Sequence, residues 1–539
     1  MTGNGRRTTW TRFTLAAVAG VISALSLAAP PSLEAQAQRG GVLRMGATIE
    51  PTTLNHGLTS QLGASMIGTK IFGSLLEYDW DFVPKPSVAE KWEVSPDGLR
   101  YTFHLRKDVT FHDGKPLTAS DVKFSVLNVL KPLHPRGPAN YGAVDDIDTP
   151  NPHTVVFKLK YPYAPFIRVF QVSESPILPR HIYEGSDIRN NPANAKPVGS
   201  GPFVFKEWVK GSHVILERNP SYFKKGQPHL DRIVYQVIPD QATRVAAFET
   251  GQVDLVPYTG IPNLEANRIK QLPNATMTTR GYESQALIMW LEFNLRKSPL
   301  SDVRVRRAIA HAIDKNFVLL NIWFGIGKVA TGPMSSVHRA FYTPEVPQYP
   351  YSLDRANQLL DEAGLKRGAD GVRVKITQDF IPYGEEYVRL AEYIREQLKK
   401  VGIDVTTRSS DTPGWFNRIW TQYDFNWTSN FVGNLTDPSI GMPRYYVSSL
   451  AKQGVPFTNS MDYKNPEIDK LFEQAARELN EGKRAAVFHQ IQRILATDLP
   501  VLPILELQPT TFYRKDLEDV VAGPFGNYES FDRMYWKKK

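Results

Sequence analysis

Apolar and polar side chains alternate over residues 99–105, in the run Leu-Arg-Tyr-Thr-Phe-His-Leu. A period of two is typical of a strand that buries one face. Asp113-Gly114 then indicates a turn. Thr118 is followed three positions later by Asp121, a spacing that predicts a capping box at the start of a helix. This region therefore predicts a strand, a turn and a helix in succession.

Further alternating runs predict four strands, and two amphipathic patterns predict helices near them. Apolar residues recur every three or four positions over 388–398, and Gly402 follows where a C-terminal cap is expected. With a strand on each side, residues 372–407 are interpreted as a βαβ unit. Ser352 is expected to cap a second helix that ends near Gly364. Alternating strands and helices favour an α/β fold class. The strand positions are Val155, Phe157 and Leu159; Ile233, Tyr235 and Val237; Val372, Val374 and Ile376; and Ile403, Val405 and Thr407.

The N-terminal segment has the pattern of a secretory signal. Three arginines lie within the first 12 residues, an apolar run follows over 13–29, and Ala-Gln-Ala stands at 35–37. This order of a basic region, an apolar region and a small-x-small cleavage site predicts a signal peptide over residues 1–37. A membrane anchor is the alternative, but a 17-residue run that ends at Pro30-Pro31 is marginal for crossing a bilayer.

The absence of cysteine bears on where the protein is located in the cell. With no cysteine in the sequence there is neither a disulfide framework nor thiol chemistry, and a lipid anchor at the cleavage point has no attachment residue. We therefore expect a periplasmic protein that is released rather than lipid-anchored. Arg6-Arg7 invites a twin-arginine interpretation, but Thr-Thr-Trp at 8–10 fits that pattern poorly, so general secretion is favoured.

The net charge of the chain says little about its binding partners. The formal net charge is +9, but lysines and arginines are interspersed with acids everywhere except at residues 537–539. A dispersed positive charge does not require a nucleic-acid partner, and none is expected. No apolar stretch after residue 37 is long enough to span a bilayer, so we expect no membrane insertion.

Motifs of catalysis and metal binding do not appear at recognisable spacing. Gly63 and Gly68 have the glycine spacing of a phosphate loop, but Thr69-Lys70 follows instead of Lys-Ser/Thr, so a loop or helix surface is favoured. None of the 11 histidines forms a His-Glu-x-x-His pair, and Gly-x-Ser-x-Gly is absent. We expect no catalytic residues, no metal and no cofactor. A secreted hydrolase without a known motif stays as an alternative.

The block over residues 99–125 resembles the signature of family 5 solute-binding proteins of ABC importers, the peptide- and nickel-binding group. Similar likeness is found at 40–55, 198–203, 248–254 and 293–314, so the resemblance covers nearly the whole chain after residue 37. It implies an α/β, two-lobe periplasmic binding protein fold (class II) with an additional inserted domain. The implied segments are a signal peptide at 1–37; lobe I at 38–78, 197–284 and 504–539; the inserted domain at 79–196; and lobe II at 285–503.

The resemblance also implies where the ligand lies. In the family, ligand lies between the lobes and pairs with an extended strand of lobe II, which here is residues 423–430. Trp427 is expected to offer a flat apolar wall, with a place in the core as the alternative. The ligand-binding residues implied in this way are Thr53, Asn55, Tyr383, Trp427, Thr428, Ser429, Asn430 and Arg444.

Two departures from the family pattern bear on the ligand. Asn430 stands where peptide-binding relatives have an aspartate for the ammonium group of the ligand, and Ile381 precedes Pro382-Tyr383 where dipeptide-binding relatives have an arginine. Without the carboxylate, a charge-assisted bond of about 1.5–3 kcal/mol is lost. A neutral, blocked or otherwise modified solute is therefore favoured over a free dipeptide. Arg444 is a candidate replacement charge, with a structural role as the alternative.

These observations predict the extracytoplasmic substrate-binding component of an ABC importer. A small-molecule or peptide-like solute would bind between the lobes and favour the closed state, and the protein would then dock on the permease and ATPase subunits. We expect a monomer. A periplasmic chaperone or sensor partner is a further alternative, since family members resemble those as well.

Overall fold

The computed structural model describes Met1 and residues 39–537. The predicted signal peptide, apart from Met1, lies outside the described residues, and so do residues 538 and 539. The chain after Ala37 forms one unit by its internal contacts, and the description below concerns that unit alone.

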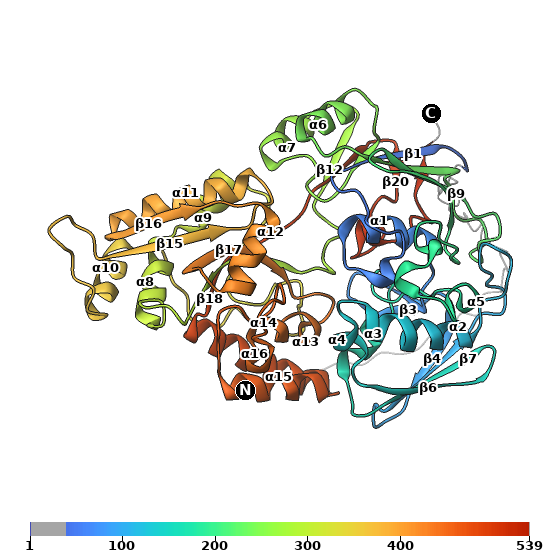
Figure 1. Ribbon diagram of the computed structural model, residues 1–539, viewed down its shortest axis with the longest axis horizontal. Helices are drawn as coiled ribbons and strands as arrows, with labels where there is room; N and C mark the ends of the chain where they lie inside the picture. Colours follow the sequence, from blue (N-terminus) through green and yellow to red (C-terminus); the bar gives the residue numbers. More distant parts are fainter. Residues whose placement is uncertain (2–38, 538–539) are drawn as a thin grey trace. The chain divides into compact units, whose positions relative to one another are not determined.

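A seven-stranded sheet draws its strands from three separate stretches of the chain. Its strands are β1 (Val42–Ala47), β8 (Phe203–Val209), β9 (His213–Arg218), β10 (Arg232–Val237), β11 (Leu255–Val256), β12 (Ala275–Thr278) and β19 (Thr511–Arg514). Their order is β12-β19-β11-β1-β10-β9-β8, with β1 parallel to β10 and β11. In Figure 1 the blue β1 accordingly lies beside green strands, with red C-terminal segments close by. This is the discontinuous sheet of lobe I. Its flanking elements are η1 (His56–Leu58), α1 (Leu62–Ile71), α6 (Gln241–Glu249), α7 (Asn263–Ile269), β20 (Leu517–Glu518), η9 (Gly526–Tyr528) and β21 (Tyr535–Trp536).

The helix α1 contains both glycines of the phosphate-loop-like spacing. Gly63 and Gly68 lie inside α1, and residues 63–71 are all buried. The expectation of a surface segment is therefore wrong, because α1 packs into the core of lobe I through Met66 and Ile71. Close packing explains the glycines without a phosphate.

A four-stranded antiparallel sheet lies in the stretch predicted as the inserted domain, residues 79–196. The strand β2 (Leu76–Tyr78) begins before residue 79 but packs into the same core, so it is described with this domain. Its elements are β2 (Leu76–Tyr78), β3 (Pro84–Pro86), β4 (Ala89–Val94), β5 (Arg100–Leu105), α2 (Ala119–Phe124), η2 (Ser125–Leu130), α3 (Lys131–Leu133), α4 (Gly137–Tyr141), β6 (Val144–Asn151), β7 (Thr154–Leu159), η3 (Ala164–Arg168), α5 (Arg180–Tyr183), η4 (Ile188–Asn190) and η5 (Pro192–Asn194). The sheet order is β4-β5-β7-β6, and helices α2 to α4 lie against it (Figure 1). The predicted strand is confirmed as β5, with Tyr101, Phe103 and Leu105 buried. The capping box is confirmed too, since Asp121 accepts from Thr118 N at 2.9 Å.

A six-stranded mixed sheet forms lobe II, in the order β14-β18-β13-β17-β15-β16. Its strands are β13 (Leu287–Phe293), β14 (Lys328–Val329), β15 (Val374–Phe380), β16 (Ile403–Arg408), β17 (Trp427–Gly433) and β18 (Val501–Glu506). Its helices are α8 (Val303–Ala312), α9 (Lys315–Phe317), η6 (Val318–Ile322), α10 (Leu353–Glu362), α11 (Glu385–Lys400), α12 (Thr412–Phe416), η7 (Asn417–Gln422), α13 (Pro438–Gly441), α14 (Pro443–Tyr446), η8 (Ser448–Leu450), α15 (Pro466–Arg477) and α16 (Glu481–Asp498). The predicted βαβ unit is confirmed by the parallel pairing of β15 with β16, and Gly402 has φ +84° at the helix end.

Both faces of the lobe II sheet are buried. In β13, Met289 and Leu291 join the core under α8, α10 and α11, whereas Ile288 and Trp290 join the core under α14 to α16. All seven residues of β13 are buried, as expected for a strand between two helical layers. The predicted end of lobe II at residue 503 falls inside β18. Since Ile288 pairs with Glu506, the chain leaves this sheet only after Glu506.

Two crossings connect lobe I with lobe II, just before β13 and just after β18. Tyr282 lies on the first crossing and Thr511 at the end of the second, and their hydroxyl oxygens are 2.5 Å apart. The Asn527 amide donates to both hydroxyl groups, at 3.0 Å to Thr511. A buried hydrogen-bond cluster therefore ties the two crossings to the C-terminal segment of lobe I.

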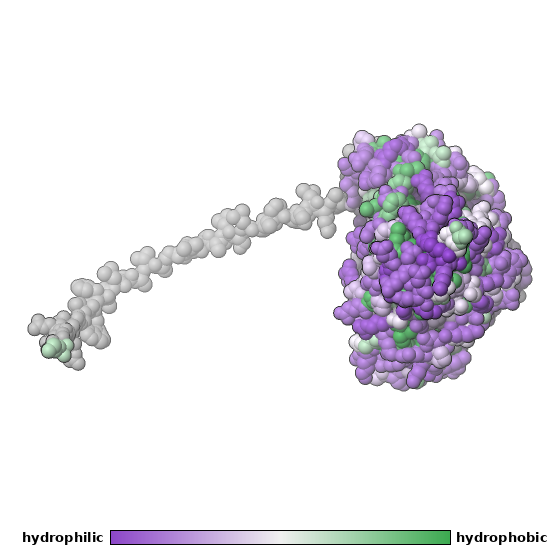
Figure 2. All heavy atoms as spheres, turned by 90° about the vertical axis from the view of Figure 1, so that its left-hand side faces the viewer, coloured by the Kyte–Doolittle hydropathy of each residue, from purple (hydrophilic) through white to green (hydrophobic). Residues whose placement is uncertain are grey.

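The surface on the lobe II side is mostly hydrophilic, with separate apolar spots (Figure 2). Scattered apolar residues of this kind are ordinary on a globular surface. Among the described residues, none of the helices combines the length and apolar character that a membrane span needs.

Candidate functional site

A cavity of about 130 Å³ lies where lobe I, the inserted domain, the first crossing and lobe II meet. We call it the outer cavity. Each segment contributes at least one side chain to it, so anything bound there contacts both lobes. Representative lining residues are Ser65, Arg136, Glu174, Gln285, Thr436 and Tyr528.

The charges in the outer cavity are balanced within the protein. Arg136 Nε donates to Glu174 Oε2 at 2.8 Å, a second bond joins the same two groups, and Asn140 Nδ2 donates to Glu174 at 3.0 Å. Burial by itself would raise the pKa of Glu174, but the Arg136 guanidinium holds it below its usual value. Gln285 contributes a donor, because its buried Nε2 has no partner among the described residues. The cavity therefore offers hydrogen-bonding groups rather than a net charge.

The strand β17 is paired on only part of one side. It pairs with β13 along its whole length but with β15 only over Trp427–Ser429. The Ile381 amide donates to the Ser429 carbonyl at 2.9 Å, so the backbone groups of Phe431 and Gly433 face the same side, beyond the end of β15. In the part of the chain that the structure describes, no strand continues this pairing. Phe431 N already donates to Asn430 Oδ1 at 2.7 Å, so this edge offers the Phe431 carbonyl and the Gly433 backbone to a short extended backbone.

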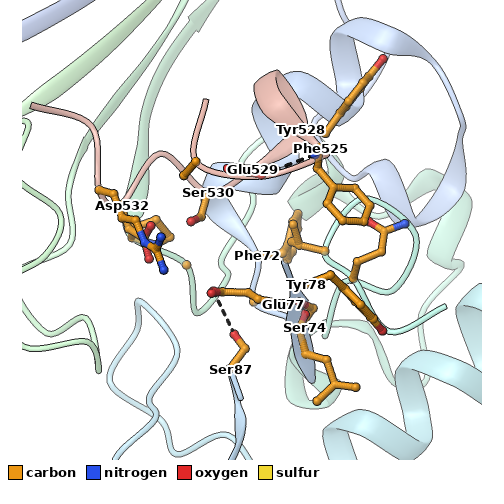
Figure 3. A pocket seen from close by; sticks show the side chains of 18 of the residues that line it. Phe72, Ser74, Glu77, Tyr78, Ser87, Phe525, Tyr528, Glu529, Ser530 and Asp532 are labelled. Atoms are coloured by element: carbon orange, nitrogen blue, oxygen red, sulfur yellow. Dashed lines mark hydrogen bonds between the residues drawn. The ribbon is translucent and has the colours of Figure 1, made fainter. Parts of the chain in front are cut away.

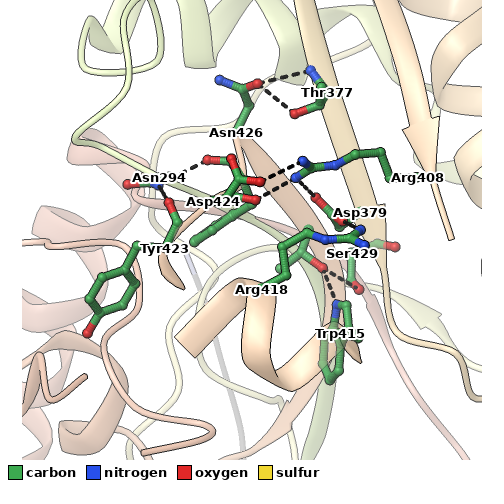
Figure 4. Close-up of polar contacts among 12 residues, drawn as sticks. Asn294, Thr377, Asp379, Arg408, Trp415, Arg418, Tyr423, Asp424, Asn426 and Ser429 are labelled. Carbon is green, nitrogen blue, oxygen red and sulfur yellow. Dashed lines mark hydrogen bonds and ion pairs between the residues drawn. The ribbon is translucent and has the colours of Figure 1, made fainter. Parts of the chain in front are cut away.

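An ion-pair network fixes β15 beside the start of β17 (Figure 4). Asp379 is 1% exposed and accepts from Arg408 at 2.7 Å and from Arg418 at 2.5 Å. Arg408 also donates to Asp424 Oδ2 at 3.0 Å. Because the carboxylate holds two guanidinium groups from different elements, the end of β15 is locked in place. The unpaired edge of β17 therefore begins at a fixed position.

The residues implied on lobe I do not reach the outer cavity. The Asn55 side chain is fully buried, accepts from Gly57 N at 3.0 Å and donates to Asn194 at 2.9 Å. Thr53 Oγ1 donates to the Asn194 carbonyl at 3.2 Å. Both side chains are used to join their loop to the end of the inserted domain.

The lobe II residues divide between the core and the edge. Trp427 is fully buried in the core cluster that also contains Trp415 and Trp420, which corrects the expectation of a wall facing a ligand. The reason is that both faces of this sheet carry helices. Thr428 is also fully buried and accepts from Trp415 Nε1 at 3.0 Å. Ser429, 2% exposed, lies at the last residue paired with β15.

Tyr383 and Asn430 lie near the unpaired edge in different ways. Tyr383 is 46% exposed, and its ring centroid is 6.1 Å from that of Phe431. Asn430 is fully buried: its Oδ1 accepts from Phe431 N at 2.7 Å, and its Nδ2 has no partner among the described residues. The neighbouring Glu292 is 1% exposed, and burial raises its pKa to about 7. Neither Asn430 nor Glu292 lines the outer cavity, so a ligand contact for Asn430 stays a prediction.

Arg444 is half-buried on α14 and lies over the Tyr445 ring, 4.6 Å from its centroid. It has no carboxylate within 4.0 Å among the described residues. Burial raises the pKa of Tyr445, although the positive charges of Arg444 and Arg136 both act to lower it. Arg444 does not line the outer cavity, so a ligand contact for it stays a prediction.

Sequence reasoning missed Arg136, Glu174 and Gln285. Arg136 stands in a segment that contains several prolines and a glycine, and its partner Glu174 is 38 positions away. No local pattern signals such a pair. The three residues were also outside every quoted likeness to the family.

A family model described as "Bacterial extracellular solute-binding proteins, family 5 Middle" matches residues 83–453, and the chain belongs to this family. Proteins of this family are extracytoplasmic solute-binding components that work with the permease and ATPase subunits of ABC importers. Among the described residues, no group of three or more histidine, aspartate or glutamate side chains is arranged to hold a metal ion.

Relatives agree with this assignment over most of the chain. The oligopeptide-binding protein AppA of Bacillus subtilis (strain 168) is 30% identical over 478 residues, which is 86% of each chain. The structure of AppA in complex with a nonapeptide is similar with a TM-score of 0.79 and 28% identity, covering 93% of this chain and 100% of that one. The binding protein AgaA from A. tumefacien R10, in complex with agropinic acid, has a TM-score of 0.76 and 26% identity, covering 93% and 99%. The expected two-lobe α/β fold is thereby confirmed.

Proposed function

We propose that this protein captures a small solute in the outer cavity, closes around it and delivers it to an ABC permease. The observation that carries the proposal is the lining of the outer cavity, to which lobe I, the inserted domain, the first crossing and lobe II all contribute. A solute that contacts both lobes stabilises the closed arrangement over the open one, which is the population shift that such a delivery requires. An affinity near 1 µM, about −8 kcal/mol, would serve this task.

We further propose a neutral, blocked or otherwise modified solute in place of a free dipeptide. Arg136 is neutralised by Glu174, and Asn430 carries no charge, so neither attracts an ammonium group at the edge of β17. Gln285 Nε2 offers a donor to a carbonyl or hydroxyl oxygen. Arg444 would pair with a carboxylate if the solute has one. The relatives that bind a nonapeptide and agropinic acid support a site that accepts both peptide-like and modified ligands.

The cellular setting of the proposal follows the N-terminal pattern. The protein is exported by a cleaved signal peptide, acts in the periplasm as a monomer without a lipid anchor, and binds its solute without chemical conversion. Sequencing of the mature N-terminus checks this part: it should begin near Gln38 in the periplasmic extract. An intact Met1 terminus in the membrane fraction would contradict it.

The solute is best identified from the protein itself. Native mass spectrometry of protein purified from its own periplasm should show a bound small molecule. The protein is then unfolded to release this molecule and refolded, and calorimetry measures the affinity when the molecule is added back. Thr436, 7% exposed, lines the outer cavity, so Thr436→Trp should fill it and abolish binding. Thr421→Trp, at an exposed position on η7, is the matched control and should bind normally. Equal binding by both variants would remove the solute from this cavity.

The same samples separate the alternatives. Incubation with peptide and glycoside libraries should give no product above a blank, whereas turnover would favour the secreted hydrolase. Tight binding of unfolded proteins, with no small molecule retained, would favour the chaperone alternative.

A further inference from the structure

A second cavity, of about 90 Å³, adjoins the outer cavity on the side of lobe I and the inserted domain. We call it the inner chamber. The two cavities share three lining residues, Gln171, Phe525 and Tyr528. Figure 3 shows Phe72, Glu77 and Tyr78 on one side of the inner chamber and the segment from Phe525 to Asp532 on the other. The inner chamber and the outer cavity are therefore adjacent, with these three side chains at the junction between them.

Gln171 stands at the junction with an unused donor. Its side chain is 4% exposed, and its Oε1 accepts from Ser173 N at 2.8 Å and from Ser173 Oγ at 2.5 Å. Those bonds fix the orientation of the amide, and its Nε2 donates to no acceptor among the described residues. Because Gln171 lines both cavities, this donor is available to an acceptor that enters either of them. A carbonyl oxygen of a ligand that passes between the cavities would be such an acceptor.

Carboxyl groups in the inner chamber exceed the cations that neutralise them. Lys224 bridges Glu77 at 2.5 Å and Asp532 at 2.7 Å, and both bonds use the same ammonium group. Glu529 forms no ion pair among the described residues, and its Oε1 accepts from Phe525 N at 3.4 Å. Arg533, which also lines the chamber, is exposed. Among the described residues, Glu529 is thus the carboxyl group of the chamber lining that has no paired cation.

The pKa of Glu529 agrees with a carboxyl group that has no paired cation. Burial, together with the negative charges of Glu77 and Asp532, raises the pKa of Glu529 to about 8, while Phe525 N and Arg533 act in the opposite direction. Lys70 is fully buried and donates to Thr69 Oγ1 and to the Asn527 carbonyl; the charge of Glu529 acts on it without a direct hydrogen bond. A cation placed beside Glu529 would relieve the repulsion among the three carboxyl groups.

Aromatic rings complete the surroundings. The Phe525 ring lies 6.0 Å from that of Tyr78 and 6.2 Å from that of Phe82, centroid to centroid. Tyr222, Phe223 and Phe72 line the same space. Aromatic faces beside a carboxylate attract organic cations, and their apolar area suits an alkyl chain.

We propose that the inner chamber binds a primary alkylammonium group, which pairs with Glu529, while Gln171 donates to a carbonyl oxygen of the same ligand at the junction. The transported solute would then carry an amine at the end of an alkyl chain, rather than an α-ammonium group at the edge of β17. The inference rests on the proposed function only for the part of the ligand that occupies the outer cavity, so the inner chamber is testable by itself.

The test uses the mature protein with two small probes of equal shape, n-butylammonium chloride and n-butanol, in ligand-observed NMR titrations. The wild type should bind n-butylammonium and should bind n-butanol at least about tenfold more weakly, the size of a lost charge-assisted contact. Binding of n-butylammonium should tighten from pH 6 to pH 9 as Glu529 loses its proton, because an alkyl amine stays charged over that range.

Variants assign the effect to one carboxyl group. Glu529→Gln keeps the shape of the side chain and should lose both the preference for the amine and its pH dependence. Glu90→Gln, exposed on β4 and distant from the chamber lining, is the matched control and should behave as the wild type. Equal binding of the two probes by the wild type, which needs no variant, or unchanged n-butylammonium binding by Glu529→Gln, would overturn the inference. Capture of the co-purified solute is measured separately by the Thr436→Trp comparison, so a failure here leaves the proposed function standing.

Discussion

Asp437 is a buried carboxylate that joins the inserted domain to lobe II. It is fully buried and accepts from Ser439 N at 2.9 Å at the start of α13. Arg484, on α16, binds both of its oxygens, at 2.9 Å in one case, and Arg168 of the inserted domain approaches to 3.6 Å. Burial by itself would raise the pKa of Asp437, but the two guanidinium groups hold it below its usual value.

We expect Asp437→Asn to be strongly destabilising. The substitution keeps the shape but removes the charge, and it leaves Arg484, 5% exposed, without a counter-ion. Breaking one side of a buried pair costs about 3–5 kcal/mol, a large part of the roughly 5–15 kcal/mol by which a domain is stable. Because the folded pKa of Asp437 is lowered, its contribution is present at neutral pH. It is lost as the pH falls below about 4 through that folded pKa.

Urea unfolding at pH 7.5 and at acid pH measures both effects. Glu362→Gln is the matched control, since the Arg355–Glu362 pair is 43% exposed at each end and should contribute at most about 1 kcal/mol. The double variant Asp437→Asn/Arg484→Met should recover part of the loss, because it removes the unpaired charge. If Asp437→Asn costs no more than the control, or if the difference from wild type persists unchanged at acid pH, the reasoning about this pair is refuted.

Three further changes have defined outcomes. Asn430→Asp restores the carboxylate of peptide-binding relatives, and calorimetry should show tighter binding of peptides with a free amino terminus, by up to about 3 kcal/mol; unchanged affinities for every ligand would remove Asn430 from the site. Glu292, whose pKa is raised to about 7, stabilises the fold below about pH 4.5 and loses roughly 3 kcal/mol as the pH rises through 7, so Glu292→Gln should flatten the urea midpoint over that range. Gly68→Ala should cost about 1–3 kcal/mol by thermal or urea unfolding, because its Cβ would overlap the buried ring of His56; a neutral result would show that α1 has room there.

Local patterns predicted local structure well. The alternation that marks β5 and the Thr118–Asp121 spacing each depend on residues a few positions apart, so the sequence contains all the information that they need. The βαβ unit was predictable for the same reason. The family likeness supplied the two-lobe arrangement, which no local pattern contains.

The candidate site was much less predictable. Trp427 was expected at a ligand wall, but whether a strand residue faces a cleft or a helical layer depends on what covers the sheet, and helices cover both faces here. Arg136 and Glu174 meet only because the chain folds back on itself over 38 positions. Gln171 gains its significance solely from the two cavities that it separates.

The hydrogen-bond cluster at the two crossings determines where the molecule would bend. Tyr282 and Thr511 share their hydroxyl groups with Asn527, so these three positions belong to one rigid piece with lobe I. Ala286 and Leu507 are hydrogen-bonded to Asn434 and Leu287 of lobe II, whereas Ser284 and Thr510 are hydrogen-bonded to lobe I, so a pivot between the lobes would lie at residues 285 and 508–509. Spin labels near Tyr282 would keep a constant distance to lobe I while lobe II turns, and distances from lobe I to α11 would report the whole motion. If the lobes open and close as proposed, the motion would be confined to two short backbone segments, whatever the length of either crossing.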